Sequence, residues 1–192
     1  MKTRTLKLAA TIAVLSLLAG CIVMSVYPFY TPKDLIFDPG LAGSWAKTGT
    51  TNQIWRFAVR GEKAYRLGVV DDTETNGFDG HLFQLKRYQF LDLLTTNRAE
   101  YQLPVHLLAK VKRSDTNLSL QFLDYGWLAG LLETNPSVLR HVVVPANPEA
   151  TNDNLVYLTA DTRDLQAFLL KHAADTNAFT GDSTVQLQRI SP

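Results

Sequence analysis

The chain has 192 residues, of which 46% are apolar, and its 19 Lys and Arg against 18 Asp and Glu give a formal net charge of +1. This length and composition fit one ordinary globular domain with a sizeable core. The charges form no block of one sign, which argues against nucleic-acid binding, and a single cysteine excludes a disulfide framework.

The first 21 residues carry a targeting pattern. Basic residues occur only before position 8, an uncharged apolar run covers Leu8–Ala19, and the run ends in Leu18-Ala19-Gly20-Cys21. A basic start, a short apolar segment and small residues before a cleavage point are typical of a secretory signal peptide. The four final residues resemble the lipobox of bacterial lipoproteins, which has Leu at the third position before the cysteine and small residues at the next two.

This resemblance implies cleavage before Cys21, a thioether-linked diacylglycerol on its sulfur and a third acyl chain on the new amino terminus. Two or three chains would anchor the protein stably, because each buried methylene contributes roughly 0.8 kcal/mol. In that family an Asp directly after the cysteine favours the inner membrane. Here the residue is Ile22, so we expect the outer membrane, with the domain facing the periplasm.

An uncleaved signal anchor is the alternative for this N-terminus. No charged residue occurs from Leu8 to Pro32, and about 20 apolar residues are enough to span a bilayer. Both interpretations tether the domain to a membrane outside the cytoplasm.

We expect three parts in the chain: a signal peptide at 1–20, a tether at 21–40 and a single sheet-rich soluble domain at 41–192. X-Pro pairs and the run Asp38-Pro39-Gly40 predict extended or turning backbone in the tether. If Cys21 is acylated, no thiol remains for a metal or for nucleophilic catalysis, and the domain must be held together by its core.

Alternating apolar residues predict strands in the first half of the domain. Residues 55–59 and 65–69 form two of them, joined by a tight turn at 60–63. The polar segment 71–80 predicts a loop. Its carboxylates leave a weak calcium site open, although the bidentate Glu of an EF-hand is missing. Residues 82–94 predict one long bent strand or two short ones.

The second half mixes strands with two helices. Further strands are predicted at 105–111, 118–122, 155–159 and 184–190, and helices at 126–133 and 161–174. The second helix has Asp161 or Thr162 as its cap and an apolar stripe of Leu165, Phe168 and Leu169. This order predicts a mainly β (α+β) fold, in which an antiparallel curved sheet or a partly closed β-barrel is capped by helices.

Two sites resemble the calycin group, which includes the lipocalins. Gly43-Ser44-Trp45 opens the domain, and Arg189 shares a strand face with Val185 and Leu187 near its end. In that group a Trp closes the bottom of a barrel and a basic residue near the chain end packs across it. The resemblance implies that Arg189 packs on Trp45, but it covers these two sites only, and the helix at 126–133 departs from the plain lipocalin order. The alternative is that Trp45 is an ordinary core residue.

No motif in the chain predicts catalysis, a metal or a cofactor. The four histidines lack metal-ligand spacing, and no Ser-His-Asp set can be assembled from the sequence. Aromatic residues are plentiful in the predicted sheet, and a curved sheet of this size can hold a small apolar ligand. We therefore expect a non-enzymatic module that binds an apolar or amphipathic molecule. The alternative is an envelope accessory protein that docks a partner protein through a sheet edge or the helix face around Trp127.

Overall fold

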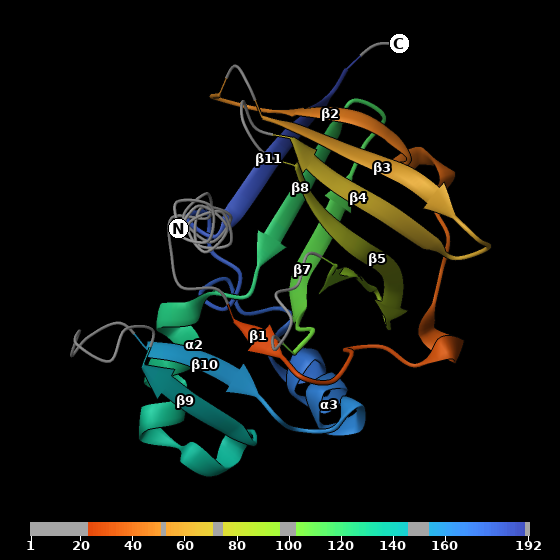
Figure 1. Cartoon of the computed structure of the whole chain (residues 1–192). Helices are drawn as coiled ribbons and strands as arrows, with labels where there is room; N and C mark the ends of the chain where they lie inside the picture. Colours follow the sequence, from red (N-terminus) through yellow and green to blue (C-terminus); the bar gives the residue numbers. More distant parts are fainter. Residues whose placement is uncertain (1–22, 51–52, 71–74, 97–102, 146–153, 191–192) are drawn as a thin grey trace, which may run out of the picture.

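A computed structural model describes residues 23–50, 53–70, 75–96, 103–145 and 154–190, and it shows a mainly β protein with two α-helices (Figure 1). Eight antiparallel strands close into a barrel, because the last of them pairs back with the first. In barrel order the strands are β2 (Gly43–Lys47), β3 (Ile54–Arg60), β4 (Ala64–Val70), β5 (Thr75–Leu85), β6 (Tyr88–Thr95), β7 (His106–Arg113), β8 (Asn117–Phe122) and β11 (Thr184–Arg189). The predicted fold class is confirmed, and the barrel is fully closed.

Alternation of apolar and polar side chains builds the barrel wall. On β3, Trp55 and Phe57 are buried while Arg56 between them is exposed, and β4 buries Tyr65 and Leu67 in the same way. Phe57 lies opposite Leu67 in the β3–β4 register. Burying a large apolar side chain contributes about 1.5–3 kcal/mol, so a one-residue slip, which would turn all of them outward, is strongly disfavoured.

A second, smaller sheet continues from the barrel wall. On one side β7 pairs with β8 through Ala109–Arg113, and with the short strand β1 (Met24–Ser25) through its first two residues. β1 runs parallel to β10 (Asn154–Leu158), which pairs antiparallel with β9 (His141–Pro145). Strands β9 and β10 belong to an insertion between β8 and β11, which lies below the barrel in Figure 1.

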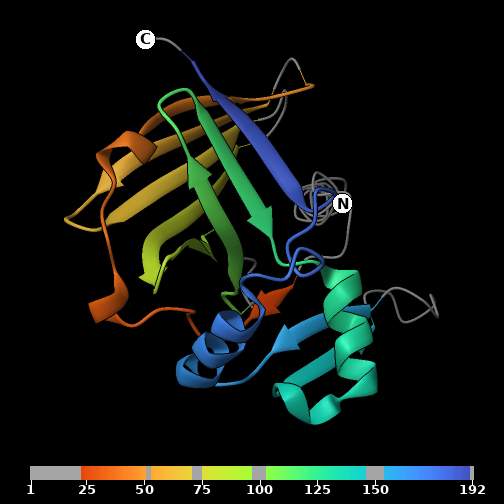
Figure 2. The ribbon, with the colours of Figure 1, turned by 180° about the vertical axis from the view of Figure 1, so that it is seen from behind.

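The insertion also carries both α-helices, α2 (Tyr125–Thr134) and α3 (Thr162–His172) (Figure 2). Each helix begins at an aspartate cap, because Asp124 accepts a hydrogen bond from the Trp127 amide and Asp161 accepts one from the Asp164 amide. No helix in the described part of the chain is long and apolar enough to cross a bilayer.

An outer core lies between the insertion and the outside of the barrel. It combines Phe83, Phe90 and Leu108, which point outward from β5, β6 and β7, with Phe168 and Leu169 of α3. The predicted docking of the α3 stripe on the sheet is therefore confirmed, and this helix covers an outer face of the barrel.

Residues 23–40 do not form the tether expected there. Val23 and Phe29 are buried in the outer core, and β1 belongs to the second sheet. The chain that follows β1 contains two 3-10 turns, η1 (Pro32–Asp34) and η2 (Pro39–Leu41). A third 3-10 turn, η3 (Pro136–Val138), follows α2. The prolines of this segment do set extended and turning backbone, but its apolar residues pack onto the barrel instead of leaving it.

The loop predicted at 71–80 is also partly wrong. β5 starts at Thr75 and pairs with β4 as far as Gly80, so a polar segment with poor strand propensity is held by its neighbour. Positions 71–74 lie outside the described residues. The segment 82–94 resolves into two strands, because Lys86 adopts a positive φ of 52° in the turn between β5 and β6.

Candidate functional site

One end of the barrel is sealed around Trp45. This side chain is completely buried, and its Nε1 donates a hydrogen bond to the Leu41 carbonyl at 3.0 Å. The Arg189 guanidinium lies 4.2 Å from the centre of the indole ring and donates to the Ala42 carbonyl at 3.1 Å. Gly43 has a φ of 127°, and a Cβ there would lie 2.7 Å from the Arg189 Nη1. The predicted packing of Arg189 on Trp45 is thus confirmed, and the glycine of the motif makes room for it.

Apolar side chains from every strand line the barrel interior. Six of them are aromatic: Trp45, Trp55, Phe57, Tyr65, Phe78 and Phe122. The Tyr65 hydroxyl is satisfied at the sealed end, where it donates to the Asp38 carbonyl and accepts from the Asp38 amide. Trp55 is different, because its Nε1 is buried and has no hydrogen-bond partner in the described part of the chain. Leaving such a group unsatisfied costs about 1–3 kcal/mol.

Two polar residues lie beyond Trp45 toward the other end of the barrel, which we call the distal end. The alternation of β2 places Lys47 on the same inward face as Trp45, one step further toward this end. The Lys47 amide donates to the Gln53 carbonyl at 3.0 Å, and the buried Gln53 lies two residues before Trp55. Lys47 and Gln53 lie toward the distal end, and Trp55, which is level with Trp45 in the β2–β3 register, follows Gln53 on the same strand face. We call these three residues the distal trio; they offer an ammonium group, an amide and an indole N–H. Lys47 makes no ion pair within the described residues.

The inward apolar face continues from the distal end onto the second sheet. Met24 belongs to the interior core and lies opposite Leu107 of β7. On its other side Met24 is paired with Tyr157 of β10, which is paired in turn with Val142 of β9. Leu155 and Tyr157 pack against the same core. Together Met24, Tyr157, Leu155, Val142 and Val144 form what we call the second-sheet face.

This arrangement places polar groups next to apolar side chains. On the second-sheet face, the exposed Val142 and Val144 offer contacts to an apolar chain. The distal trio offers two neutral hydrogen-bonding groups and one positive charge to a polar or anionic head. Such a combination of an apolar lining with a few placed polar groups is typical of small-molecule sites.

A second buried polar cluster lies outside the barrel, under the N-terminal segment. The Asp92 carboxylate is fully buried, accepts from the Phe29 amide at 2.9 Å and lies 2.7 Å from the His106 Nδ1. Ser25 lies opposite His106 in the β1–β7 register. The residue types of a hydrolase triad are therefore neighbours, but the Ser25 hydroxyl is buried and donates to the Tyr27 carbonyl at 2.7 Å. The cluster holds the segment in place and offers no accessible nucleophile.

Two histidines are held in environments that disfavour their charged form. The His81 ring stacks on Tyr30 at 4.8 Å, and burial lowers the pKa of His81 below its usual value of 6.5. Burial, with Asp92 adding to it, raises the pKa of Tyr30 to about 12. The pKa of His172 is likewise lowered, first by burial and then by the nearby Lys171.

The remaining candidates from the sequence are placed as follows. Cys21 lies outside the described residues. Of the possible calcium ligands, Asp79 forms ion pairs with Arg60 and Arg66, and positions 71–74 are not described. Among the described residues, no three metal-ligand side chains gather. The Trp127 ring packs against Phe168 and His172. Sequence reasoning missed the Asp92 cluster, whose only signal was an Asp between two core leucines.

Comparison of the chain with protein-family models, with curated proteins and with solved structures found no match. The class of protein is therefore defined by the fold itself: a closed eight-stranded antiparallel barrel with a two-helix, two-strand insertion before its last strand.

Proposed function

We propose that this chain is a lipid-anchored envelope protein whose barrel binds an amphipathic small molecule without transforming it. The carrying observation is the buried Trp55 Nε1, which has no partner among the described residues although it belongs to an otherwise apolar interior. An acceptor oxygen on a ligand would satisfy this N–H, with Gln53 and Lys47 beside it. The apolar part of the molecule would contact the barrel lining and the second-sheet face.

The anchor is part of the same proposal. Lipid on Cys21 would hold the protein in the membrane. The expected location is the outer membrane, with the domain facing the periplasm. Kinship with the calycin group is supported by the contact between Arg189 and Trp45. Labelling with palmitate tests the anchor directly: the wild type should incorporate it and Cys21→Ser should not. Equal labelling of both proteins contradicts the proposal.

Binding is tested with a fluorescent long-chain fatty acid, excited by energy transfer from tryptophan. The protein for this titration is the mature chain carrying Cys21→Ser, which keeps every described residue. Trp55→Phe retains the ring but removes the N–H, so affinity should fall about two- to tenfold, as expected for losing one hydrogen bond. Lys47→Gln should reduce affinity for the fatty acid but not for the corresponding alcohol.

Two matched variants control this titration. Trp127→Phe removes an indole N–H outside the barrel, and Lys171→Gln removes an exposed charge on α3. Both should bind like the parent protein. No binding by the parent, or equal loss in all four variants, contradicts a ligand site at the distal end.

Docking of a partner protein is the second candidate function, and one observation supports it. The α2 face around Trp127 is packed against α3, but β9 is a sheet edge with exposed valines. A barrel that binds no amphiphile and retains a partner protein through β9 would favour this alternative.

A further inference from the structure

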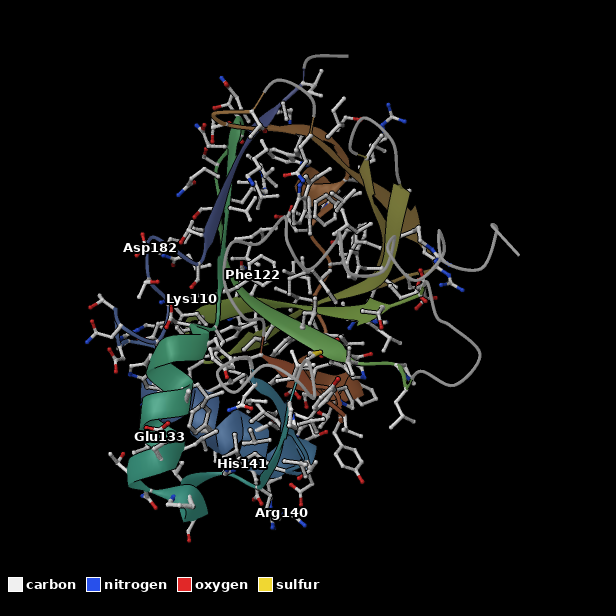
Figure 3. All side chains as sticks on the ribbon, turned by 60° about the vertical axis from the view of Figure 1, so that its left-hand side comes forward. Lys110, Phe122, Glu133, Arg140, His141 and Asp182 are labelled. Atoms are coloured by element: carbon white, nitrogen blue, oxygen red, sulfur yellow. The ribbon has the colours of Figure 1, made fainter. Side chains whose placement is uncertain are left out.

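The most continuous exposed apolar surface in the described part of the chain is strand β9. Its consecutive valines Val142, Val143 and Val144 are 50%, 48% and 40% exposed, whereas the other large exposed apolar side chains are scattered over the molecule. Within the described residues β9 pairs with β10 alone, so its outer edge is free. Figure 3 shows this edge of the insertion beside the labelled Arg140 and His141. Apolar surface of this kind usually marks a contact with a partner or a membrane.

The register places this edge next to the point where the chain enters the fold. Met24 of β1 is level with Tyr157 of β10, which is level with Val142 of β9. Val142 is therefore two inter-strand spacings, roughly 10 Å, from Met24. Cys21 precedes Met24 by three residues, which span at most roughly 10 Å of chain.

The direction of the strands strengthens this placement. β1 and β10 are parallel and β9 runs opposite to them, so the chain reaches Met24 from the side on which β9 ends and β10 begins. The valines at the end of β9 are thus on the side of Met24 at which β1 begins. Because residues 23–40 pack on the barrel, no long tether separates the domain from its anchor.

We infer that β9 is the membrane-contact edge of this protein, and that it lies in the headgroup region of the bilayer that holds the Cys21 lipid. The inference rests on the proposed anchor. Half-exposed valines gain by leaving water, and apolar segments lie in this region in many peripheral proteins. The unpaired edge backbone keeps the strand out of the hydrocarbon layer, because unsatisfied amides are disfavoured there, whereas headgroups and water satisfy them.

A second copy of the chain fits this edge less well than lipid does. β9 has five residues, and a strand of that size is only about 17 Å long. A stable dimer needs about 800 Å² from each partner. Charge does not select a partner either. The exposed Arg140 next to β9 lies 3.9 Å from the carboxylate of Asp161, which offsets its positive charge. Binding should therefore depend little on the fraction of anionic lipid.

This orientation gives the proposed ligand a path from the bilayer to the barrel along apolar side chains. Val142 and Val144 share the second-sheet face with Tyr157 and Met24, and that face continues into the barrel core. An amphiphile that leaves the bilayer at β9 would meet apolar side chains all the way to the distal end. The energetic barrier for an apolar chain, which is its exposure to water, is thereby removed.

The test uses the lipidated full protein in vesicles of phosphatidylethanolamine and phosphatidylglycerol. Cys21 is the only cysteine, so an introduced cysteine is the one reactive thiol once Cys21 is acylated. Val143→Cys receives an environment-sensitive nitrobenzoxadiazole probe. Its matched control is Val59→Cys, because Val59 is 53% exposed and is the next-to-last residue of β3, at the sealed end of the barrel. In Figure 1 the end of β3 lies at the right, far from β9 at the lower left.

The probe at Val143 of the vesicle-bound lipidated protein should emit roughly twofold more than the same probe on the unacylated Cys21→Ser chain in buffer, since the interface excludes much of the water. Lipids carrying a doxyl quencher near the headgroup should then quench it. The probe at Val59 should change in neither measurement. The inference is overturned if the emission of neither probe increases in vesicles, or if the emission of both probes increases equally. Far-ultraviolet circular dichroism verifies that both variants are folded.

Palmitate labelling of the same preparations separates this inference from the proposed function. If the protein is acylated but the Val143 probe stays dark, the β9 orientation is wrong and the anchor stands. If the protein is not acylated, the anchor fails, and the inference fails with it. Ligand binding is measured independently by the fatty-acid titration.

Discussion

Replacing Asp92 with alanine should release the N-terminal segment from the barrel wall without opening the barrel itself. The carboxylate accepts from the Phe29 amide at 2.9 Å and bonds the His106 Nδ1 at 2.7 Å, and it is fully buried. The variant would leave an amide and an imidazole nitrogen without this partner. Each such loss costs about 1–3 kcal/mol, so the free energy of unfolding should fall by about 2–5 kcal/mol. That is a large part of the roughly 5–15 kcal/mol available to a domain.

Urea unfolding and amide hydrogen exchange of the Cys21→Ser mature chain measure this effect. The Phe29 amide should exchange much faster in the variant, while amides in β4 stay protected until global unfolding. Asp182→Ala is the control, because Asp182 is exposed and its loss should change stability by less than about 0.5 kcal/mol. An unchanged urea midpoint, or a Phe29 amide as protected as in the parent, would refute the assigned role of Asp92.

Three other variants test the packing and electrostatics. Phe168→Ala should cost about 3–5 kcal/mol in urea unfolding, because it empties a site in the outer core, whereas exposed Lys171→Ala should stay within about 0.5 kcal/mol; similar midpoints would show that α3 is not packed. Because burial lowers the pKa of His81, the unfolded chain takes up a proton that the folded protein resists, so stability should decrease as the pH falls below about 6.5. His81→Gln should weaken this decrease, and a profile identical to the parent's would contradict the burial. Arg189→Met should lower the free energy of unfolding by about 1–3 kcal/mol, because the variant loses the hydrogen bonds to carbonyl groups and the contact with the Trp45 ring. The near-ultraviolet circular dichroism of Trp45 should change as well, and an unchanged spectrum would argue against the seal.

The barrel wall could be predicted because it depends on alternation along single strands. The packing of Arg189 on Trp45 was implied by the resemblance to the calycin group, and alternation added only that Arg189 falls on the same strand face as Val185 and Leu187. The capping aspartate of α3 and its apolar stripe were likewise readable from local spacing. Closure of the barrel was less accessible, since the β11–β2 pairing joins strands from opposite ends of the chain.

The second sheet and the distal trio could not be predicted, because both depend on contacts between distant segments. β1 is only two residues long, too short for a pattern. The three valines of β9 have high strand propensity, but without alternation they do not indicate a face or a partner strand. Asp92 sits on an outward face, where a carboxylate would normally meet water. It is buried only because the segment around Phe29, far away in sequence, covers it. No pattern in the sequence shows that Trp55 Nε1 lacks a partner.

The pairing of β1 with β10 also sets an order of assembly. Met24 is among the first residues of the described fold to be synthesised, yet its partner Tyr157 follows more than a hundred residues later. β11, which closes the barrel, comes later still. Contacts between such distant positions slow folding, because a long loop must be closed before they form. The segment around Met24 must therefore remain unpaired on that side until nearly the whole chain has emerged, and the second sheet can be completed only near the end of folding.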